Sequence, residues 1–335
     1  MLETSLPGVG APTAEPARLR TASILGIGTA LPGRVVGNEE IARRHGLEAA
    51  WIEQRTGIRE RRFAAPDESL TALAGAAAEA ALDACGTAAA DVDLVLVATM
   101  TADDLLPNAA PLVAEAIGAR GAFACDLGAA CTGFLSGIAL AAAQIESGRA
   151  RTALVVGADL LSRVTDHGDR KTSGLFADGA GAAVLGGGGA GAIERLLLRS
   201  DARRSDCIVA GHDERLIRMR GQDTFREAVD SLSAITAEVL AEESLGVDDV
   251  DLFVYHQANA RITRAVGERL GLDPARVIDC IAQLGNTSAA TLPLALAEAQ
   301  RRGMLAAGDR VLLAAFGAGF VWGGGLLRWD GRVAP

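Results

Sequence analysis

The sequence repeats itself at a fixed spacing, and this repeat constrains the fold more than any other feature. Two pairs of segments, DVDLVLV with DVDLFVY and TALVVG with RVLLAA, lie 158 residues apart, and an alanine-rich pair follows with a shift of two residues. The matching segments are 91–97 with 249–255, 152–157 with 310–315, and 139–144 with 295–300. Three collinear matches predict a duplicated fold whose two halves pack as pseudo-twofold mates.

Apolar strand patterns alternate with helical patterns along both halves, which is typical of layered α/β folds with largely parallel sheets. The predicted strands are 23–27, 94–98, 122–125, 153–157 and 182–185, and the predicted helices are 51–55, 69–85, 109–117, 133–146 and 292–301. We expect an N-terminal half over residues 21–190 and a C-terminal half over residues 191–335. Residues 1–20 are rich in Pro, Ala, Thr and Gly without an apolar period, which predicts a disordered tail.

Composition limits which partners the protein can bind and in which compartment it can work. Five cysteines without paired spacing argue against a disulfide framework and against a zinc site. Together with the lack of a secretory leader pattern or a bilayer-spanning run, this predicts a cytoplasmic protein without a membrane partner. A formal net charge of −10 disfavours nucleic acid. Arginine clusters at 55–62, 163–171 and 215–226 are either solvated surface or phosphate contacts.

One stretch, DLGAACTGF at residues 126–134, carries a candidate nucleophile. An apolar run at 121–127 predicts a buried strand, and a helical pattern begins at Phe134. Cys131 therefore stands on a strand-to-helix turn, where unpaired N–H groups and the helix dipole favour thiolate over thiol. The alternative interpretation is a small buried apolar residue, as most unpaired cysteines are.

The repeat brings two further polar residues to this turn. If the halves superpose, the mate of the Cys131 turn is GNTSAA at 285–290, and the mate of the strand end at 94–98 begins at Tyr255. We therefore expect Cys131, His256 and Asn286 to converge at the junction of the halves. A cysteine beside a histidine is an activated thiol nucleophile, which serves hydrolysis or acyl transfer. An added amide N–H holds the oxygen of a thioester enolate, which suits carbon–carbon bond formation.

The remaining polar and glycine-rich features are weaker. FGAGF at 316–320 follows a buried strand, and an inward backbone N–H there would complete an oxyanion hole with the N–H of Cys131. DGAGA at 178–182 predicts a tight structural turn. His45 and His212 lie in charged segments typical of solvated surface, and His167 is interpreted as a loop residue. The sequence contains no P-loop, no GxGxxG after the first strand and no metal-ligand spacing.

Taken together, these motifs resemble the β-ketoacyl-acyl-carrier-protein synthase III family of the thiolase superfamily. The resemblance covers residues 21–329 and is carried by WIEQRTGI at 51–58, AACTGF at 129–134, DGAGA at 178–182, HQAN at 256–259, GNTSAA at 285–290 and FGAGF at 316–320. It implies a thiolase fold with duplicated halves in α-β-α-β-α layers. Elongating relatives carry a second histidine in place of Asn286, and thiolases carry another cysteine near the C-terminus.

The resemblance implies a two-step reaction. Cys131 takes an acyl group from acyl-CoA while the N–H groups of Cys131 and Ala318 hold the oxyanion. Malonyl-acyl carrier protein then loses carbon dioxide with its thioester held by His256 and Asn286, and the enolate gives a 3-oxoacyl product that primes fatty acid or polyketide synthesis. Acyl transfer to another acceptor without decarboxylation is the alternative activity. A partner subunit that sets chain length is a non-enzymatic alternative, but it typically loses the nucleophile.

The same resemblance assigns binding residues. Trp51 would stack on the CoA adenine, with Arg55 and Arg170 on its phosphates and Asn259 beside them, while Arg226 and Arg261 would meet the acidic carrier protein. Leu106 and Phe134 would line the acyl pocket, with Leu106 reaching into the partner of a homodimer. No metal or tightly bound cofactor is implied beyond CoA thioester and the carrier's phosphopantetheine. Residues 200–219 look short for a lid, and Leu106 replaces a bulky aromatic, which predicts acceptance of acyl groups longer than acetyl.

Overall fold

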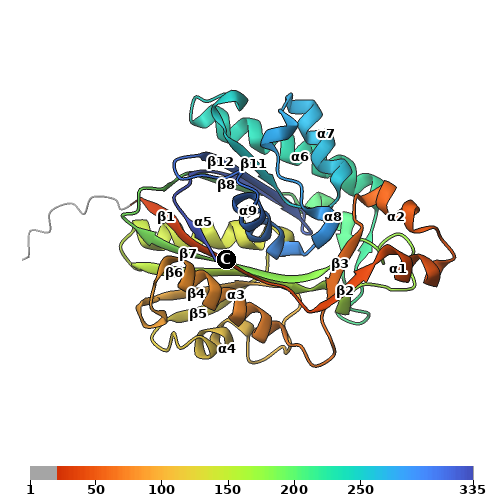
Figure 1. Ribbon diagram of the computed structural model, residues 1–335, viewed down its shortest axis with the longest axis horizontal. Coiled ribbons are helices and arrows are strands. Elements are labelled where there is room, and N and C mark those ends of the chain that lie inside the picture. The colour runs from red at the N-terminus through yellow and green to blue at the C-terminus, as the bar shows by residue number, and fades with distance from the viewer. Residues whose placement is uncertain (1–20, 335) are drawn as a thin grey trace, which may run out of the picture.

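The structure is a computed structural model that describes residues 21–334 (Figure 1). Two mixed β-sheets are stacked with helices between and outside them. The first sheet has the strand order β14-β1-β7-β6-β4-β5, and the second has the order β11-β12-β13-β8. Their bounds are β1 Ala22–Ala30, β4 Leu94–Ala98, β5 Phe123–Leu127, β6 Thr152–Leu160, β7 Asp178–Gly187 and β14 Arg332–Val333, then β8 Ala192–Ser200, β11 Leu252–Tyr255, β12 Arg310–Gly317 and β13 Val321–Arg328.

The predicted duplication is confirmed by the strand order. The run β1-β7-β6-β4 is matched by β8-β13-β12-β11, and each run has two antiparallel pairings followed by a parallel one. The mate of β5 is reduced to a single parallel bridge between Phe253 and Val277. The expectation of largely parallel sheets is wrong. The segments that join β6 to β7 and β12 to β13 contain no α-helix. In both halves the second strand of the pair therefore runs antiparallel to the first.

The helices form three layers around the sheets, as the α-β-α-β-α prediction requires (Figure 1). Helices α3 and α4 cover the outer face of the first sheet, α5 and α9 lie between the sheets, and α6 and α7 cover the second sheet. Their bounds are α3 Leu70–Cys85, α4 Ala109–Ala116, α5 Gly133–Glu146, α6 Gly221–Glu242, α7 Ala260–Leu270 and α9 Thr291–Arg301. The central helix α5 is apolar on nearly all sides, because it packs on both sheets.

Several smaller elements lie around this core. Two short antiparallel pairs are β2 Arg34–Gly37 with β3 Glu60–Phe63, and β9 Ile208–Val209 with β10 Arg218–Met219. The remaining helices are α1 Asn38–His45, α2 Ala49–Thr56 and α8 Ile281–Leu284. No helix within residues 21–334 combines the length and the apolar character needed to cross a bilayer.

Two strand predictions need correction. The run at 121–127 is not a buried strand, because β5 is the edge of the first sheet, and Phe123 is 68% exposed. The segment at 178–182 is the start of β7 and not a tight turn. Asp178, the first residue of β7, is buried, and its carboxylate accepts hydrogen bonds from Ser162 and from the Ala64 N–H. Its acidic side chain therefore joins three segments at the strand start.

Arg61, which lies in the first predicted arginine cluster, is a fully buried structural residue. Its guanidinium donates to the Val36 and Gly174 carbonyl oxygens and to Asn38 Oδ1. Burial lowers the pKa of Arg61 to about 10. These bonds tie the two-stranded sheet β2–β3 to the loop before β7, so this arginine is neither solvated surface nor a phosphate contact.

The ends of the chain bear on the predicted division of the halves. The predicted tail at 1–20 lies outside the described residues. A boundary between residues 190 and 191 remains our proposal, and β8, which opens the second sheet, begins at Ala192. The last strand departs from the predicted division, because β14 pairs with β1 in the first sheet.

Candidate active site

Cys131 lies in a 3-10 turn, Ala130–Thr132, between strand β5 and helix α5. Ala130 has a left-handed backbone with φ 44°, which turns the chain sharply before the helix. Close packing fixes this turn. A Cβ atom on Gly317, the last residue of β12, would lie 2.8 Å from the Cys131 nitrogen. The end of β12 therefore runs directly against the backbone of Cys131.

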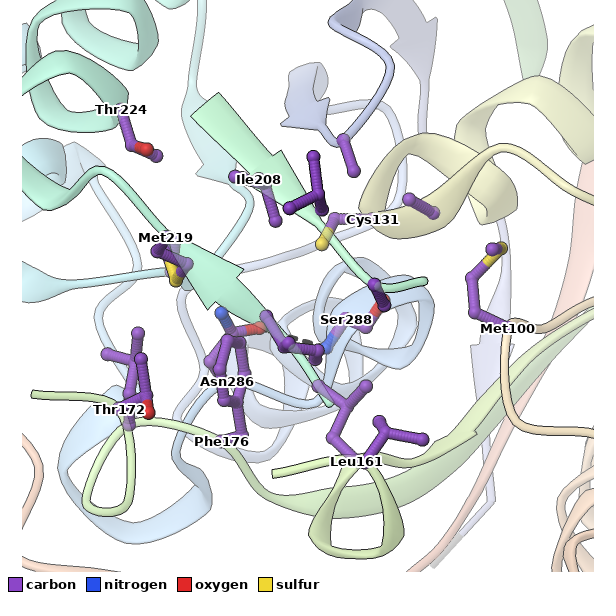
Figure 2. A pocket seen from close by; sticks show the side chains of 18 of the residues that line it. Met100, Cys131, Leu161, Thr172, Phe176, Ile208, Met219, Thr224, Asn286 and Ser288 are labelled. Atoms are coloured by element: carbon purple, nitrogen blue, oxygen red, sulfur yellow. Dashed lines mark hydrogen bonds between the residues drawn. The ribbon is translucent and has the colours of Figure 1, made fainter. Parts of the chain in front are cut away.

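The second half repeats this turn at the expected spacing. Ser288–Ala290 form a 3-10 turn before α9, and Ser288 has φ 52°, 158 residues after Ala130. The two turns contact each other. Asn286, just before the second turn, accepts a hydrogen bond from the Ser288 N–H through Oδ1 at 2.9 Å. Because the amide oxygen is engaged in this way, the amide nitrogen is the atom free to face the cavity (Figure 2).

His256 directly follows β11 and is only 1% exposed. Its Nδ1 lies 2.6 Å from the Thr291 Oγ1, and its ring meets the Phe316 ring edge-on at 5.4 Å between centroids. Burial lowers the pKa of the His256 imidazole to about 3. His256 is therefore a neutral imidazole at physiological pH, able to accept a proton.

One cavity of about 1900 Å³ joins these groups. Its lining includes all predicted catalytic, CoA-binding and carrier-contacting residues: Trp51, Arg55, Cys131, Arg170, Arg226, His256, Asn259, Arg261, Asn286 and Ala318. Figure 2 shows the Cys131 sulfur and the Asn286 side chain directed into the same space. The structure thus brings together the three groups that the repeat predicted would meet.

The expectation of a resting thiolate at Cys131 is not supported. Burial raises the pKa of the Cys131 thiol to about 12, the nearby Ser288 hydroxyl lowers it and the Asp159 carboxyl raises it. A helix N-terminus stabilises an anion by about 0.3–1 kcal/mol, which is less than one pKa unit. Desolvation therefore outweighs the helix dipole, and the free enzyme holds a thiol beside a neutral imidazole.

A pH titration of alkylation tests this thiol state. With a pKa of about 12, the thiolate fraction at pH 7 is about 10⁻⁵ and rises about tenfold per pH unit. We expect the rate of iodoacetamide addition at Cys131, read by peptide mass spectrometry, to rise from pH 6 to pH 9 without levelling. The denatured chain is the control, and its rate should bend toward a plateau once the pH exceeds the ordinary thiol pKa of about 8.5. A plateau below pH 8 in the folded protein would contradict the assignment.

Two backbone N–H groups complete the site. Ala318 follows β12 and lines the cavity, and the strand end holds it beside the Cys131 turn. Within the described chain, neither the Cys131 N–H nor the Ala318 N–H donates to a backbone carbonyl. Both N–H groups thus remain available to an oxyanion.

The predicted CoA-binding residues lie toward the rim of the cavity. The Arg55 guanidinium stacks 4.3 Å above the half-buried Trp51 ring, so the two form one cation–aromatic unit. Arg170 is exposed at the rim. Asn259 has local bonds instead, because its Oδ1 accepts from the Arg261 N–H at the start of α7 and its Nδ2 donates to the Arg55 carbonyl. It joins α2 to α7, a role that the sequence did not indicate.

The predicted carrier contacts and acyl-pocket residues have different outcomes. Arg226 and Arg261 are both exposed at the cavity, the first paired with Asp223 and the second stacked on Phe225. Phe134 does not line the cavity. It is fully buried between the sheets because helix α5 turns this side chain into the core. Leu106 is 80% exposed and lies outside the cavity lining, so its predicted role depends on a second copy of the chain.

The segment at 200–219, which looked short for a lid, still covers the cavity. Ile208, Met219 and the loop between β9 and β10 contribute to the lining (Figure 2). The Ile217 N–H donates to the Val164 carbonyl oxygen at 2.8 Å, and Arg218 pairs with Asp166. The hairpin is therefore attached to the loop that follows β6.

Some neighbours of the site escaped the sequence analysis. Thr291 contacts His256, and the buried Asp159 carboxyl accepts from Thr99, Thr101 and the N–H groups of Met100 and Ala289. The position of Thr291, at the first turn of the repeated helix, was the only available signal. His45 is not solvated surface, because its ring bonds Ser173 Oγ at 2.9 Å. His167 is a structural loop residue packed on Phe63, and His212 is exposed at the cavity.

Comparison with known proteins gives consistent matches. Two family models match, 3-oxoacyl-[acyl-carrier-protein] synthase III over residues 125–202 and its C-terminal part over residues 240–329. Beta-ketoacyl-[acyl-carrier-protein] synthase III 2 of Streptomyces coelicolor is 43% identical over 92% of this chain and 94% of the relative. The Rhodospirillum rubrum beta-ketoacyl-[acyl-carrier-protein] synthase III is 45% identical over 91% and 98%.

Solved structures agree with the sequence relatives. The 3-oxoacyl-(acyl carrier protein) synthase III of Pseudomonas aeruginosa superposes with a TM-score of 0.90 at 41% identity, over 94% of this chain and all of that chain. The priming β-ketosynthase of the R1128 polyketide biosynthetic pathway superposes with a TM-score of 0.91 at 35% identity, over 97% and 100%. This chain belongs to the β-ketoacyl-acyl-carrier-protein synthase III family of the thiolase superfamily.

Proposed function

We propose that this enzyme joins an acyl group from acyl-CoA to malonyl-acyl carrier protein by decarboxylative Claisen condensation, which primes fatty acid or polyketide synthesis. One observation carries the proposal. The Cys131 thiol, a neutral His256 imidazole and the Asn286 amide nitrogen line a single cavity. A nucleophile with its base serves acyl transfer, and two donors beyond it serve an enolate.

In the first half-reaction Cys131 attacks the acyl-CoA carbonyl carbon. His256 takes the thiol proton as the sulfur–carbon bond forms, and the N–H groups of Cys131 and Ala318 hold the oxyanion. The carbon–sulfur bond to CoA then breaks, and the CoA thiolate takes the proton from His256. Deprotonation coupled to attack is required because burial leaves almost no thiolate in the free enzyme.

In the second half-reaction malonyl carried on the carrier protein enters the same cavity. Its carbon–carboxylate bond breaks, carbon dioxide leaves, and negative charge develops on the thioester oxygen, to which Asn286 and His256 donate hydrogen bonds. The enolate carbon attacks acyl-Cys131, the new carbon–carbon bond forms and the sulfur–carbon bond breaks. The product is 3-oxoacyl-carrier protein. The overall balance consumes one proton, which restores the thiol of Cys131.

The charge at the rim supports the proposed CoA and carrier contacts. Although the chain has a net charge of −10, the cavity lining has more cations than carboxylates. It contains Arg55, Arg163, Arg170, Lys171, Arg215, Arg226, Arg261 and Arg269 against Asp103, Asp104, Asp126 and Asp230. We assign Trp51, Arg55 and Arg170 to the CoA nucleotide, and Arg226 and Arg261 to the acidic carrier protein. Such a local positive field attracts anionic partners to an acidic enzyme.

An apolar surface beside the cavity supports a homodimer. Strand β5 is an unpaired sheet edge, and exposed apolar side chains cluster with it: Met100, Leu105, Leu106, Leu112 and Phe123. An uncovered edge of this kind pairs readily with another strand. We propose that a second copy covers it and that Leu106 of each copy closes the acyl end of the other cavity. Sedimentation of the full chain measures this state.

Two further assignments complete the proposal. We place the enzyme in the cytoplasm, because all five of its cysteines are free thiols, which a reducing compartment maintains. Its substrates bring their own pantetheine arms, so we assign no tightly bound cofactor.

The test supplies acyl-CoA and malonyl-carrier protein to the full chain and measures three products. We expect an acyl mass on Cys131 with acyl-CoA alone, then release of carbon dioxide and 3-oxoacyl-carrier protein when malonyl-carrier is added. Acyl transfer to the carrier without carbon dioxide would support the acyltransferase alternative, which Cys131 and His256 alone would serve. No acyl mass at Cys131 would overturn both.

The same assay tests the acyl group that the pocket accepts. Leu106 stands where a bulky aromatic would close the pocket, and the cavity near Cys131 is lined by Leu161, Phe176 and Ile208 (Figure 2). We therefore expect butyryl- and branched acyl-CoA to acylate Cys131 within about tenfold of acetyl-CoA, since each buried methylene favours binding by about 0.8 kcal/mol. Replacing Leu106 by Phe should reduce the longer substrates selectively. Turnover of acetyl-CoA alone would contradict this prediction.

A further inference from the structure

We infer that Thr291 is a positioning residue for the two half-reactions. Its hydroxyl keeps the hydrogen of neutral His256 on Nδ1, so that Nε2 alone takes up and releases protons. The inference rests on the proposed function and specifies which tautomer of His256 carries it out.

The hydrogen-bond partners of Thr291 favour one arrangement of the hydrogens. Thr291 Oγ1 lies 3.0 Å from the Ser288 carbonyl oxygen and 2.6 Å from His256 Nδ1. A carbonyl oxygen only accepts, and a hydroxyl has a single hydrogen. The hydroxyl hydrogen therefore goes to Ser288, and Oγ1 accepts from Nδ1–H. The opposite tautomer would set the lone pairs of Oγ1 and the Ser288 carbonyl against each other.

Packing prevents the ring from escaping this arrangement. Thr291 and His256 are 2% and 1% exposed, and Phe316 fixes the ring from another side. The repeat shows that these two positions face each other in both halves. Ala98 and Gly133 precede His256 and Thr291 by 158 residues each, and a Cβ on Gly133 would lie 2.6 Å from Ala98 Cβ. In the first half these two positions are in direct contact without polar side chains, whereas in the second half they hold a histidine and its hydroxyl partner.

The tautomer has different consequences for the two steps. In acylation the Nε2 lone pair accepts the Cys131 proton directly. In condensation Nε2 donates only after it binds a second proton, because Nδ1 keeps its own. His256 then acts as an imidazolium opposite the malonyl carboxylate, and its proton passes to the Cys131 thiolate when the sulfur–carbon bond breaks. That proton comes from solvent, so one proton is consumed per turnover.

Few titratable groups surround His256 to disturb this assignment. Cys131 lines the same cavity, and the Asp159 carboxyl is held by hydroxyl and N–H donors. Tyr255 turns its hydroxyl to Thr236 at 3.2 Å, away from the site. The pH dependence of condensation therefore reports the imidazolium of His256.

The test compares Thr291→Val with Thr291→Ser and with Thr236→Val, which removes a buried hydroxyl elsewhere in the fold. In ¹⁵N-histidine-labelled enzyme, which has four histidines, we expect His256 to show a protonated Nδ1 and a bare Nε2. Thr291→Val should populate the Nε2–H form and slow acylation at least about tenfold. Thr291→Ser should restore both, and Thr236→Val should change neither.

The pH profile gives a second readout that simple destabilisation would not reproduce. In the malonyl-bound enzyme the malonyl carboxylate raises the pKa of the His256 imidazolium above its free value of about 3. Condensation by the wild type should fall as pH rises through this raised pKa, whereas Thr291→Val, whose Nε2 already carries a hydrogen, should lose that limb. A protonated Nε2 in the neutral wild-type ring would overturn the inference even if Thr291→Val fails to fold. Unchanged tautomer and acylation in a folded Thr291→Val would also overturn it. A wild type that never acquires an acyl group would instead overturn the proposed function.

Discussion

Cys131→Ala is expected to lose acyl transfer from CoA by at least about ten-thousand-fold, because no other side chain at the cavity replaces the sulfur. Decarboxylation of malonyl-carrier should persist within about tenfold, since His256 and Asn286 reach the malonyl thioester without the sulfur. Intact-protein mass spectrometry reads the first half-reaction, and release of labelled carbon dioxide in the absence of acyl-CoA reads the second.

Cys280→Ala is the matched control for this variant. Cys280 is a buried cysteine that lies outside the cavity lining and packs in the core between the sheets. The control should lose stability through its small cavity and keep both half-reactions. Persistent acyl transfer by Cys131→Ala would place the nucleophile elsewhere. Loss of decarboxylation together with acylation would mean that the sulfur also serves the second step.

The convergence at the site was predictable because it follows from a repeat that the sequence displays. Matching segments fix which turns are equivalent, and equivalent turns of a pseudo-twofold fold meet at its axis. The small residues around Cys131 and Asn286 then indicate close backbone approach. Strand direction was not predictable in this way. It depends on whether a connection carries an α-helix, and the segments after β6 and β12 gave no clear signal for that.

Properties that depend on tertiary partners were missed or wrong. The sequence around Arg61 indicates a surface charge. Only the structure shows that the Val36 and Gly174 carbonyl oxygens accept hydrogen bonds from it. The helix start at Cys131 indicated a thiolate, but burial, which decides the pKa, is set by elements far away in the chain. In the sequence Thr291 is an ordinary small residue of a predicted helix, and only the structure shows its contact with His256. Local pattern thus predicted which groups meet at the cavity, whereas their protonation states required the packed structure.

These protonation states explain why one cavity can serve two reactions. A resting ion pair of thiolate and imidazolium would need no base for acylation and would offer His256 as a donor from the start. A neutral pair offers the base first, and the donor appears only when a negatively charged malonyl group enters. The order of the two half-reactions is therefore consistent with the charge that each substrate brings.

Asn286→Asp is expected to spare acylation within about threefold and to slow condensation at least about hundredfold, the typical cost of removing one oxyanion donor. The substitution keeps an oxygen for the Ser288 N–H, which holds the turn at 2.9 Å through Oδ1 in the wild type. It replaces the amide nitrogen that faces the cavity by a second oxygen. Only the donor toward the enolate is lost, and a like charge takes its place.

Asn286→Ala separates the donor from the turn, because it removes both. If only the donor matters for condensation, Asn286→Ala should slow that step as much as Asn286→Asp does. Asn286→Ala should also melt at a lower temperature, because the buried Ser288 N–H loses its acceptor. Single-turnover acylation with acyl-CoA and carbon dioxide release from malonyl-carrier measure the two steps. Equal loss of both steps in Asn286→Asp would show that the amide positions Cys131 as well, and the division of labour between sulfur and amide would then be wrong.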